Sequence, residues 1–166
     1  MTKVPRKRRW LMRGGLVVAG VVAVAVVATT LASWRRPELG VVEGELRPCP
    51  DSPNCVSSFE PRESHHVAAL PVQGDPESAL PRLVAVVDEM PGASLIAETD
   101  DYAHIEFVSP VMRYVDDVEL LLDEAAGEIH IRSASRVGHS DLGANRARVE
   151  AIRERWESAA TEKTVE

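Results

Sequence analysis

The chain opens with a long apolar stretch, and shorter amphipathic patterns follow only after a polar segment. Residues 14–34 carry no charged side chain. At about 1.5 Å per helical residue they reach the roughly 30 Å thickness of a bilayer core. A backbone in lipid must satisfy its own hydrogen bonds, so we expect one transmembrane helix here. Residues 35–62 are rich in proline and polar residues and are expected to form a linker with a cysteine-containing loop.

The apolar spacing after this linker predicts an α+β domain over residues 63–160. Its expected elements are strands, a helix that begins at or after Ser78 and ends at Met90-Pro91-Gly92, and a last helix from Ser140 or Asp141 to about Ala159. The strands are expected at 66–72, 94–98, 102–108, 114–123 and 128–135. We therefore expect a mainly antiparallel sheet of about five strands with both helices on one face. Residues 161–166 are expected to be a disordered tail.

The last two predicted strands fix their own register. They flank the four-residue loop 124–127, and pairing Asp123 with Glu128 sets Leu122, Leu120 and Val118 on one face. The other face then carries Glu119 opposite Arg132, with charges of both signs close by. This face is expected to be open, because both helices cover the other. It holds four candidate ligand-binding residues: Asp117, Glu119, Arg132 and Arg136. The alternative is a solvated face with ion pairs worth about 0 to 1 kcal/mol each.

A polar residue interrupts the apolar stripe of the last helix. The stripe comprises Leu142, Asn145, Val149, Ile152 and Trp156. A buried asparagine must find hydrogen-bond partners, and we expect them in the turn 136–139. One interpretation is a structural clamp between helix and strand. The other is that Asn145 and Arg146 present donors to an anionic group at the helix N-terminus.

Charge is divided sharply along the chain. The formal net charge is −7, yet eight of the 19 basic residues precede Pro37 and all 26 acidic residues follow it. The remaining 11 basic residues leave residues 37–166 at −15. Such a domain should repel nucleic acid, so we expect no nucleic-acid partner. Six basic residues lie in 1–13 and two follow the apolar stretch. The positive-inside rule therefore predicts a cytoplasmic basic tail at 1–13, and a domain outside the cell membrane.

A cleaved signal peptide is the main alternative to a retained helix. Its apolar region usually runs about 7 to 15 residues before a small-x-small site, which is shorter than the stretch here. The best cleavage site, Thr30-Leu31-Ala32, has a poor first position. Trp10 and Trp34 also lie at the two ends of the stretch, where indole rings favour the interface. We therefore expect a signal anchor.

The only two cysteines, Cys49 and Cys55, are close together in the chain. In an oxidising compartment they could form a disulfide, which on the chain-entropy model stabilises by roughly 2 kcal/mol. Free thiols and metal or redox chemistry are the alternatives, but the spacing is not Cys-x-x-Cys. The five histidines have no convincing metal spacing. We expect no metal and no cofactor.

Four segments resemble one known family when taken together. The resemblance spans about residues 46–156, to the bacterial and plastid family called domain-of-unknown-function family 1499. The family is named for lacking a known activity, and its members often look membrane-attached or exported. The matching segments are 49–58 (Cys-Pro-Asp-Ser-Pro-Asn-Cys-Val-Ser-Ser), 116–119 (Asp-Asp-Val-Glu), 132–138 (Arg-Ser-Ala-Ser-Arg-Val-Gly) and 140–146 (Ser-Asp-Leu-Gly-Ala-Asn-Arg).

Three functions remain open at this point. The first is an extracytoplasmic binding module for a small anionic or lipid-like ligand, or for an envelope protein, because arginines such as Arg132, Arg136 and Arg146 suit carboxylate or phosphate. The second is a structural or assembly component of the cell envelope without a ligand. The third is a hydrolase or transferase that uses Asp116, Asp117 or Asp141 with His139. No nucleophile elbow, metal-ligand run or phosphate loop supports an enzyme.

Overall fold

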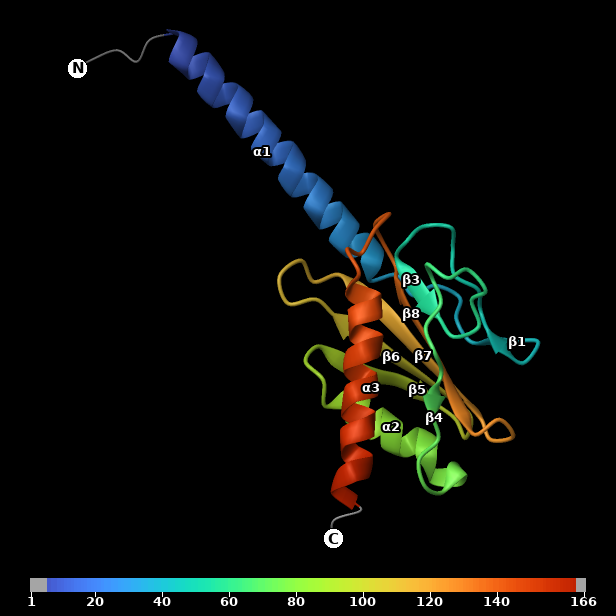
Figure 1. Ribbon diagram of the computed structural model, residues 1–166. Coiled ribbons are helices and arrows are strands. Elements are labelled where there is room, and N and C mark those ends of the chain that lie inside the picture. Colours follow the sequence, from blue (N-terminus) through green and yellow to red (C-terminus); the bar gives the residue numbers. More distant parts are fainter. Residues whose placement is uncertain (1–5, 164–166) are drawn as a thin grey trace.

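The computed structural model describes residues 6–163, with the side chains of residues 14–161. One long N-terminal helix leads into a domain in which a sheet is flanked by two helices (Figure 1). In chain order the elements are α1 (Arg6–Ser33), β1 (Val41–Val42), β2 (Glu45–Leu46), β3 (Cys55–Ser57), β4 (Leu70–Pro71), η1 (Pro76–Ser78), α2 (Ala79–Asp88), β5 (Ala93–Glu98), β6 (Tyr102–Val108), β7 (Val115–Asp123), β8 (Glu128–Ser135) and α3 (Ala144–Lys163).

The domain is built on a six-stranded antiparallel sheet. Its strand order is β3-β8-β7-β6-β5, and β4 pairs with the start of β8. The register predicted for β7 and β8 is confirmed, with Asp123 opposite Glu128 and Glu119 opposite Arg132. The α+β class is confirmed as well. This part of the sheet could be predicted because the alternation of apolar and polar residues in four long strands, together with a four-residue loop, restricts the register.

Helices α2 and α3 cover one face of the sheet, as expected (Figure 1). Burying each large apolar side chain contributes about 1.5 to 3 kcal/mol relative to leaving it in water. The expected stripe of α3 is wrong at its first member, because Leu142 precedes the helix and is 96% exposed. The core between sheet and helices includes Leu80, Leu83, Val87, Ile105, Val118, Leu120, Ile129, Ile131, Val149, Ile152 and Trp156.

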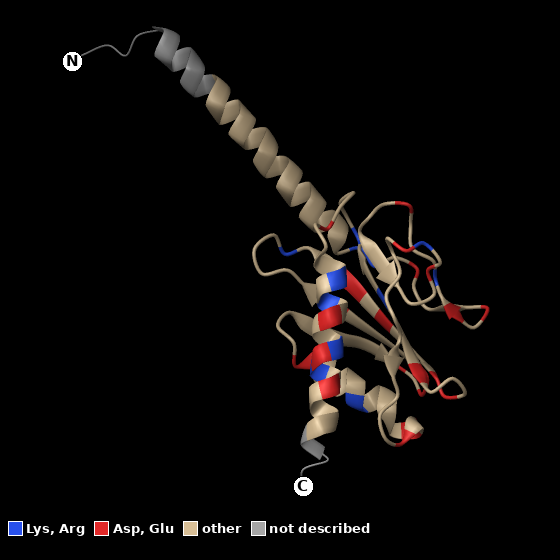
Figure 2. Ribbon diagram, viewed as in Figure 1, with Lys and Arg blue, Asp and Glu red and all other residues tan. Residues whose placement is uncertain are grey.

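The other face of the sheet is not open, and this part of the prediction was wrong. The end of α1, the following chain and the β1-β2 hairpin lie against it, and β2 packs on β7 and β8 (Figure 1). Leu46 of β2 and Ser33 of α1 are buried. Acidic and basic segments meet on the sheet near the end of α1 (Figure 2). The charges predicted to be solvated are therefore enclosed between the sheet and the N-terminal segment.

Several predicted boundaries also differ from the structure. The segment 35–62 contains β3, a strand of the main sheet, so the folded core begins well before residue 63. The strand expected at 66–72 is reduced to β4 and an isolated bridge at His66. Helix α3 continues to Lys163, so 161–163 are helical, while 164–166 of the expected tail lie outside the described residues. Helix α1 begins at Arg6, inside the basic tail, of which residues 1–5 are not described.

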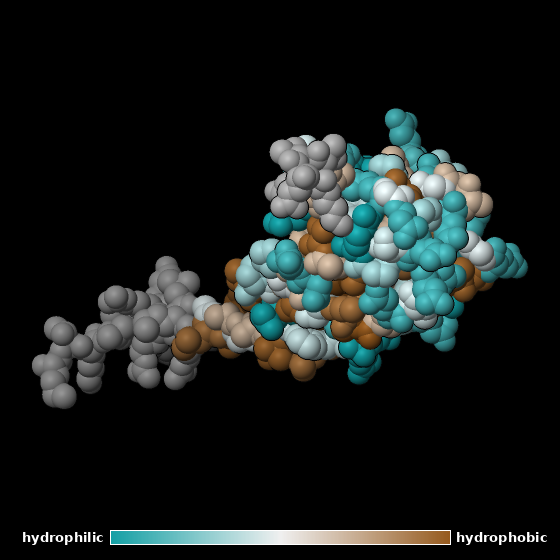
Figure 3. Space-filling model, turned by 90° about the horizontal axis from the view of Figure 1, so that it is seen from below, coloured by the Kyte–Doolittle hydropathy of each residue, from teal (hydrophilic) through white to brown (hydrophobic). Residues whose placement is uncertain are grey.

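Helix α1 is long and apolar enough over Gly14–Ser33 to cross a membrane, by length and composition. It extends away from the domain, and its described side chains are mostly exposed. Seen from below, apolar residues of α1 emerge beside a domain surface that is mostly hydrophilic (Figure 3). The helix thus has the surface expected of a membrane anchor or a signal sequence.

Candidate functional site

Six charged or titratable side chains gather on the covered face of the sheet. We call them the ionic cluster. They come from β6, β7, β8 and the residue just after β8, and period-2 alternation places them on one face. Five of them are less than 10% exposed, and the guanidinium end of the sixth is enclosed as well. The members are His104, Glu106, Asp117, Glu119, Arg132 and Arg136.

Arg136 is the centre of the first half of the cluster. Its Nη2 lies 2.6 Å from Oδ1 of Asp117 and 2.6 Å from Oε1 of Glu106, and its Nε donates to Oδ2 of Asp117 at 2.8 Å. Two parallel bonds to one carboxylate give the pair a fixed geometry. Burial disfavours the charge on Arg136 most strongly, but the hydrogen bonds with both carboxylates outweigh it and raise the pKa of the guanidinium.

Asp117 accepts three hydrogen bonds inside the cluster. Its Oδ1 also lies 2.7 Å from Nε2 of His104, on the neighbouring strand. Burial acts to raise the pKa of Asp117, yet the hydrogen bonds from Arg136 and His104 outweigh burial and lower it. The pKa of Glu106 is lowered for the same reason, with burial opposed by hydrogen bonds from Arg36 and Arg136. Both carboxylates therefore stay ionised inside the protein.

Glu119 organises the second half of the cluster. Nη1 of Arg132 donates to its Oε2 at 2.8 Å, and the hydroxyl of Tyr102 donates to its Oε1 at 3.0 Å. Burial and the charge of Glu119 raise the pKa of Tyr102, so the phenol remains a donor. Nε of Arg132 is buried without a hydrogen-bond partner among the described residues. The hydrogen-bonding capacity of Glu119 is therefore used more fully than that of Arg132.

The end of α1 and the chain that follows it form hydrogen bonds with both halves of the ionic cluster. Nη1 of Arg136 donates to the carbonyl of Ser33 at 3.1 Å, and Nε of Arg36 donates to Glu106 at 2.7 Å. The backbone N–H of Gly40 donates to Glu119 at 2.8 Å. The ionic cluster therefore joins the sheet to the end of the apolar helix.

Three members of the cluster have the donor set of a metal site. One ligand atom each from His104, Glu106 and Asp117 lies within 4.8 Å of the others, and all three residues are buried. The guanidinium of Arg136 already lies between the two carboxylates. A divalent cation would have to displace this arginine, so the geometry favours an ion-pair network over a metal centre.

Asn145, predicted to share a site with the arginines, lies on the opposite face of the sheet. It is fully buried, and its Oδ1 accepts hydrogen bonds from Ser133 Oγ at 2.7 Å and from Arg148 Nη1 at 2.6 Å. Its Nδ2 donates to the carbonyl of Asn54, to Ser135 Oγ and to Asp141. The prediction that its partners lie in the turn 136–139 is wrong. The partners come instead from β8, from the loop before β3, from the residues that precede α3 and from α3 itself.

Arg146 is separate from both groups. Its guanidinium donates to the backbone carbonyls of His66 and Ser64 on the protein surface. The candidate residues of the sequence therefore fall into three places, and they do not converge on one pocket. Asp116 lies on the helix face, where Arg148 binds it at 2.6 Å, so it does not act together with Asp117. Asp116 and Asp141 do line one small cavity.

The residues that sequence reasoning missed are His104, Glu106, Arg36 and Arg148. For the first two a signal existed, because Tyr102, His104 and Glu106 alternate with apolar residues along β6. Antiparallel pairing then places Glu106 opposite Asp117. For Arg36 there was no periodic signal, since it lies in an irregular segment.

Cys49 and Cys55 form a disulfide, which confirms the predicted pairing. Beside it, Arg62 binds Glu60 through Nε at 2.6 Å and Nη2 at 2.9 Å, and also donates to the carbonyl of Cys49. The backbone N–H of Cys49 donates back to Glu60. Glu60 and Arg62 therefore tie the disulfide loop to the chain that follows β3.

The hydrogen bonds to Glu60 predict a dependence of stability on acid pH. The hydrogen bond from Arg62 first, and the one from Cys49 next, lower the pKa of Glu60 from 4.5 to about 2, against the opposing effect of burial. A carboxyl with a lowered folded pKa stabilises the protein above its unfolded pKa, and this contribution disappears as the pH falls through the folded value. The free energy of unfolding of wild type should therefore fall between about pH 4.5 and pH 2.

A substitution isolates this contribution. Glu60→Gln should lower the free energy of unfolding at pH 7 and flatten its decline in acid, measured by denaturant unfolding at a series of pH values. Glu63→Gln, at an exposed neighbouring position, serves as the matched control and should keep the wild-type slope. Equal slopes for Glu60→Gln and wild type would show that Glu60 does not carry the effect.

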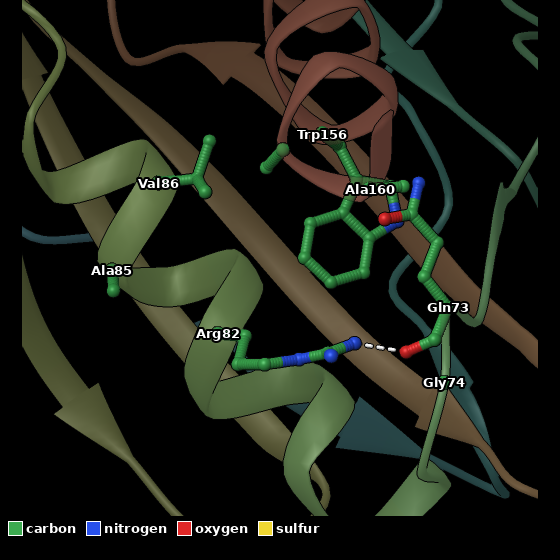
Figure 4. Close-up of a pocket in the computed structure, with 8 residues that line it drawn as sticks. Gln73, Gly74, Arg82, Ala85, Val86, Trp156 and Ala160 are labelled. Carbon is green, nitrogen blue, oxygen red and sulfur yellow. Dashed lines mark hydrogen bonds between the residues drawn. The ribbon is translucent and has the colours of Figure 1, made fainter. Parts of the chain in front are cut away.

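An apolar cavity of about 430 Å³ lies between α2 and α3, away from the ionic cluster. Trp156 and Val86 form part of its wall, and the guanidinium of Arg82 lies beside the indole ring and donates to the carbonyl of Gln73 (Figure 4). The cavity has room for a small apolar group. Its polar lining belongs mainly to Arg82 and Gln73, so it offers few groups for specific recognition.

Together these features define a class: a disulfide-bonded α+β domain, joined through an ionic cluster to an N-terminal apolar helix of membrane-spanning length. The chain belongs to the family described as protein of unknown function (DUF1499), whose model matches residues 45–155. The resemblance inferred from the sequence is thereby confirmed. Neither the curated proteins nor the solved structures gave a significant match to the chain.

Proposed function

We propose that the protein is a single-pass membrane protein whose α1 stays attached and holds the α+β domain outside the cytoplasm. The excess of basic residues before the apolar stretch supports a cytoplasmic N-terminus. The disulfide between Cys49 and Cys55 supports an oxidising compartment for the domain. In this proposal, the membrane is the first partner of the chain.

The observation that carries this proposal is that the end of α1 is part of the folded domain. Ser33 is fully buried. Its Oγ accepts a hydrogen bond from the backbone N–H of Val115 at 3.3 Å, and its carbonyl accepts one from Arg136. Cleavage after Ala32 would cut the chain next to this buried residue. A retained helix keeps these contacts intact.

The same contacts support a structural role for the ionic cluster. Arg132 and Arg136 donate to protein carboxylates, and Arg146 donates to protein carbonyls. These arginines therefore favour the envelope structural or assembly component over the binding module for a small anionic ligand. In this role, the cluster holds the domain at a fixed orientation to its anchor.

Membrane extraction tests the retained helix. The full chain, expressed in a bacterial host, should remain in the membrane pellet after alkaline carbonate treatment, with the uncleaved mass of 18.1 kDa. Protease added outside spheroplasts should digest the domain. The control Val21→Arg/Val24→Arg places two charges in the span, at a cost of about 2.5 to 3.5 kcal/mol each, and should lose resistance to carbonate. A soluble product that starts at Ser33 would overturn the proposal.

A further inference from the structure

Two loops of the domain lie beside the end of α1. One joins β6 to β7 over residues 109–114, and the other joins β8 to α3 over residues 136–143. We call them the membrane-facing loops (Figure 1). They carry exposed large apolar side chains: Val111 is 84% exposed, Leu142 is 96% exposed, and Met112 is 37% exposed. Exposed apolar side chains that gather at one end of a domain are typical of a surface that contacts another protein or a membrane.

The first loop is bonded directly to α1. Oγ1 of Thr30 donates to the carbonyl of Met112 at 3.1 Å, and Nε1 of Trp34 donates to the carbonyl of Arg113 at 3.1 Å. Thr30 lies three residues before the end of the apolar segment Gly14–Ser33, a rise of about 5 Å along the helix. If this segment crosses the bilayer, the loop lies at the level of its last turn. That level is the membrane interface.

The second loop holds its leucine rigidly outward. Leu142 has a φ of 55°, in the left-handed region that is uncommon for a bulky residue. Its backbone N–H donates to Ser140 Oγ at 3.2 Å, and the carboxylate of Asp141 accepts hydrogen bonds from the N–H groups of Gly143 and Asn145. These bonds fix the loop. The exposure of Leu142 is therefore built into the fold.

The charges of the membrane-facing loops are also compatible with contact between these loops and a bilayer. The domain as a whole is strongly acidic, but residues 109–114 contain no acidic residue and include Arg113. The second loop has one acid, Asp141, whose carboxylate is engaged by backbone N–H groups. A cavity of about 280 Å³ lies between the loops next to α1, and its lining includes Thr29, Tyr114, Leu142 and two acids, Asp116 and Asp141. Arg148 binds Asp116, and backbone N–H groups bind Asp141, so both carboxylates of this cavity are paired where lipid approaches the domain.

We infer that the membrane-facing loops form a second lipid-contacting site, in which Val111, Met112 and Leu142 enter the outer leaflet beside α1. The inference rests on the proposed function, because it takes the bilayer position from α1. The occupant is the phospholipid bilayer itself. With two contacts, the domain is held against the membrane surface and cannot swing about a single tether.

Spin labelling of the full chain in phospholipid vesicles tests the site. The native cysteines are paired in a disulfide, so single cysteines at Val111 and Leu142 can be labelled without removing them. Ala125, an exposed residue in the β7-β8 loop at the opposite end of the sheet, is the matched control. A label at Val22, within α1, reports whether the helix is inserted. The ratio of collision rates with oxygen and with a water-soluble nickel chelate measures depth.

The labels at positions 111 and 142 should show a several-fold higher ratio than the label at 125. A label at 22 that reads as lipid-embedded, together with labels at 111 and 142 that match 125, would overturn this inference and leave the anchor standing. A water-exposed label at 22 would overturn the anchor instead. Circular dichroism of each labelled variant establishes that it is folded.

Discussion

Replacing Arg136 with leucine is expected to lower the free energy of unfolding of the domain by about 3 to 5 kcal/mol, because removing one partner of a buried ion pair leaves the other charged and unpaired. Two carboxylates are affected, those of Asp117 and Glu106, each of which has an oxygen 2.6 Å from Nη2 of the guanidinium. The bond to the carbonyl of Ser33 is lost as well. Denaturant unfolding of the full chain in detergent, followed by far-UV circular dichroism, measures the loss.

Arg146→Leu is the matched control for this substitution. Both arginines lie in segments that resemble the family and were candidates for the same site, yet the guanidinium of Arg146 donates to backbone carbonyls at the surface. Its replacement should change the free energy of unfolding by less than about 1 kcal/mol. Similar losses for the two variants would contradict the assignment of Arg136 to a buried network.

A second variant separates charge burial from loss of packing. Asp117→Asn added to Arg136→Leu removes the carboxylate that has lost its arginine, whereas Glu106 keeps its bond from Arg36, so the double variant should be more stable than Arg136→Leu alone. Limited proteolysis adds a local measurement. In Arg136→Leu the segment 34–48 should be cut faster than in wild type, because the hydrogen bond from Arg136 to the carbonyl of Ser33, the residue just before this segment, is lost.

The sequence was informative where long strands face one another. The apolar and charged pairs of β7 and β8 both require one register, and a one-residue shift would turn every side chain to the wrong face. Glu119 and Arg132 could therefore be paired from the residue pattern alone. The same reasoning gave the two helices and their face of the sheet.

The burial of these charges could not be predicted, because it depends on an irregular segment. Among residues 34–48 Leu46 is the one buried side chain, and the segment also contacts the sheet through the backbone of Gly40 and the side chain of Arg36. None of these has a periodic pattern. A polar, proline-rich composition resembles a linker whether the chain is free or packed.

The neighbours of Asn145 could have been predicted in part. The register of β7 and β8 places Ser133 on the helix face, opposite Val118, so its hydroxyl could have been predicted to lie near the buried amide. The carbonyl of Asn54 could not be predicted, since it comes from a loop of residues 47–54. Predicting it would have required knowing that β3 joins the sheet beside β8.

Asn145→Ala is expected to lower the free energy of unfolding by about 2 to 4 kcal/mol, because it removes five hydrogen bonds of a buried amide, each with a net contribution of about 0.5 to 1.5 kcal/mol. The hydroxyl of Ser133 loses its acceptor, and the carbonyl of Asn54 keeps only the backbone N–H of Ser135 as a donor. Ser158→Ala, at an exposed position of the same helix, should stay within about 0.5 kcal/mol of wild type.

The size of this loss decides between the two interpretations of Asn145. An asparagine that clamps α3 to β8 and to the loop before β3 should destabilise the domain when it is removed, whether or not any anion is present. An asparagine kept for binding an anion would be replaced at little cost in stability. Unfolding curves of Asn145→Ala that overlay those of wild type would therefore contradict the clamp. The complete burial of the side chain and its five hydrogen bonds to surrounding groups favour the clamp.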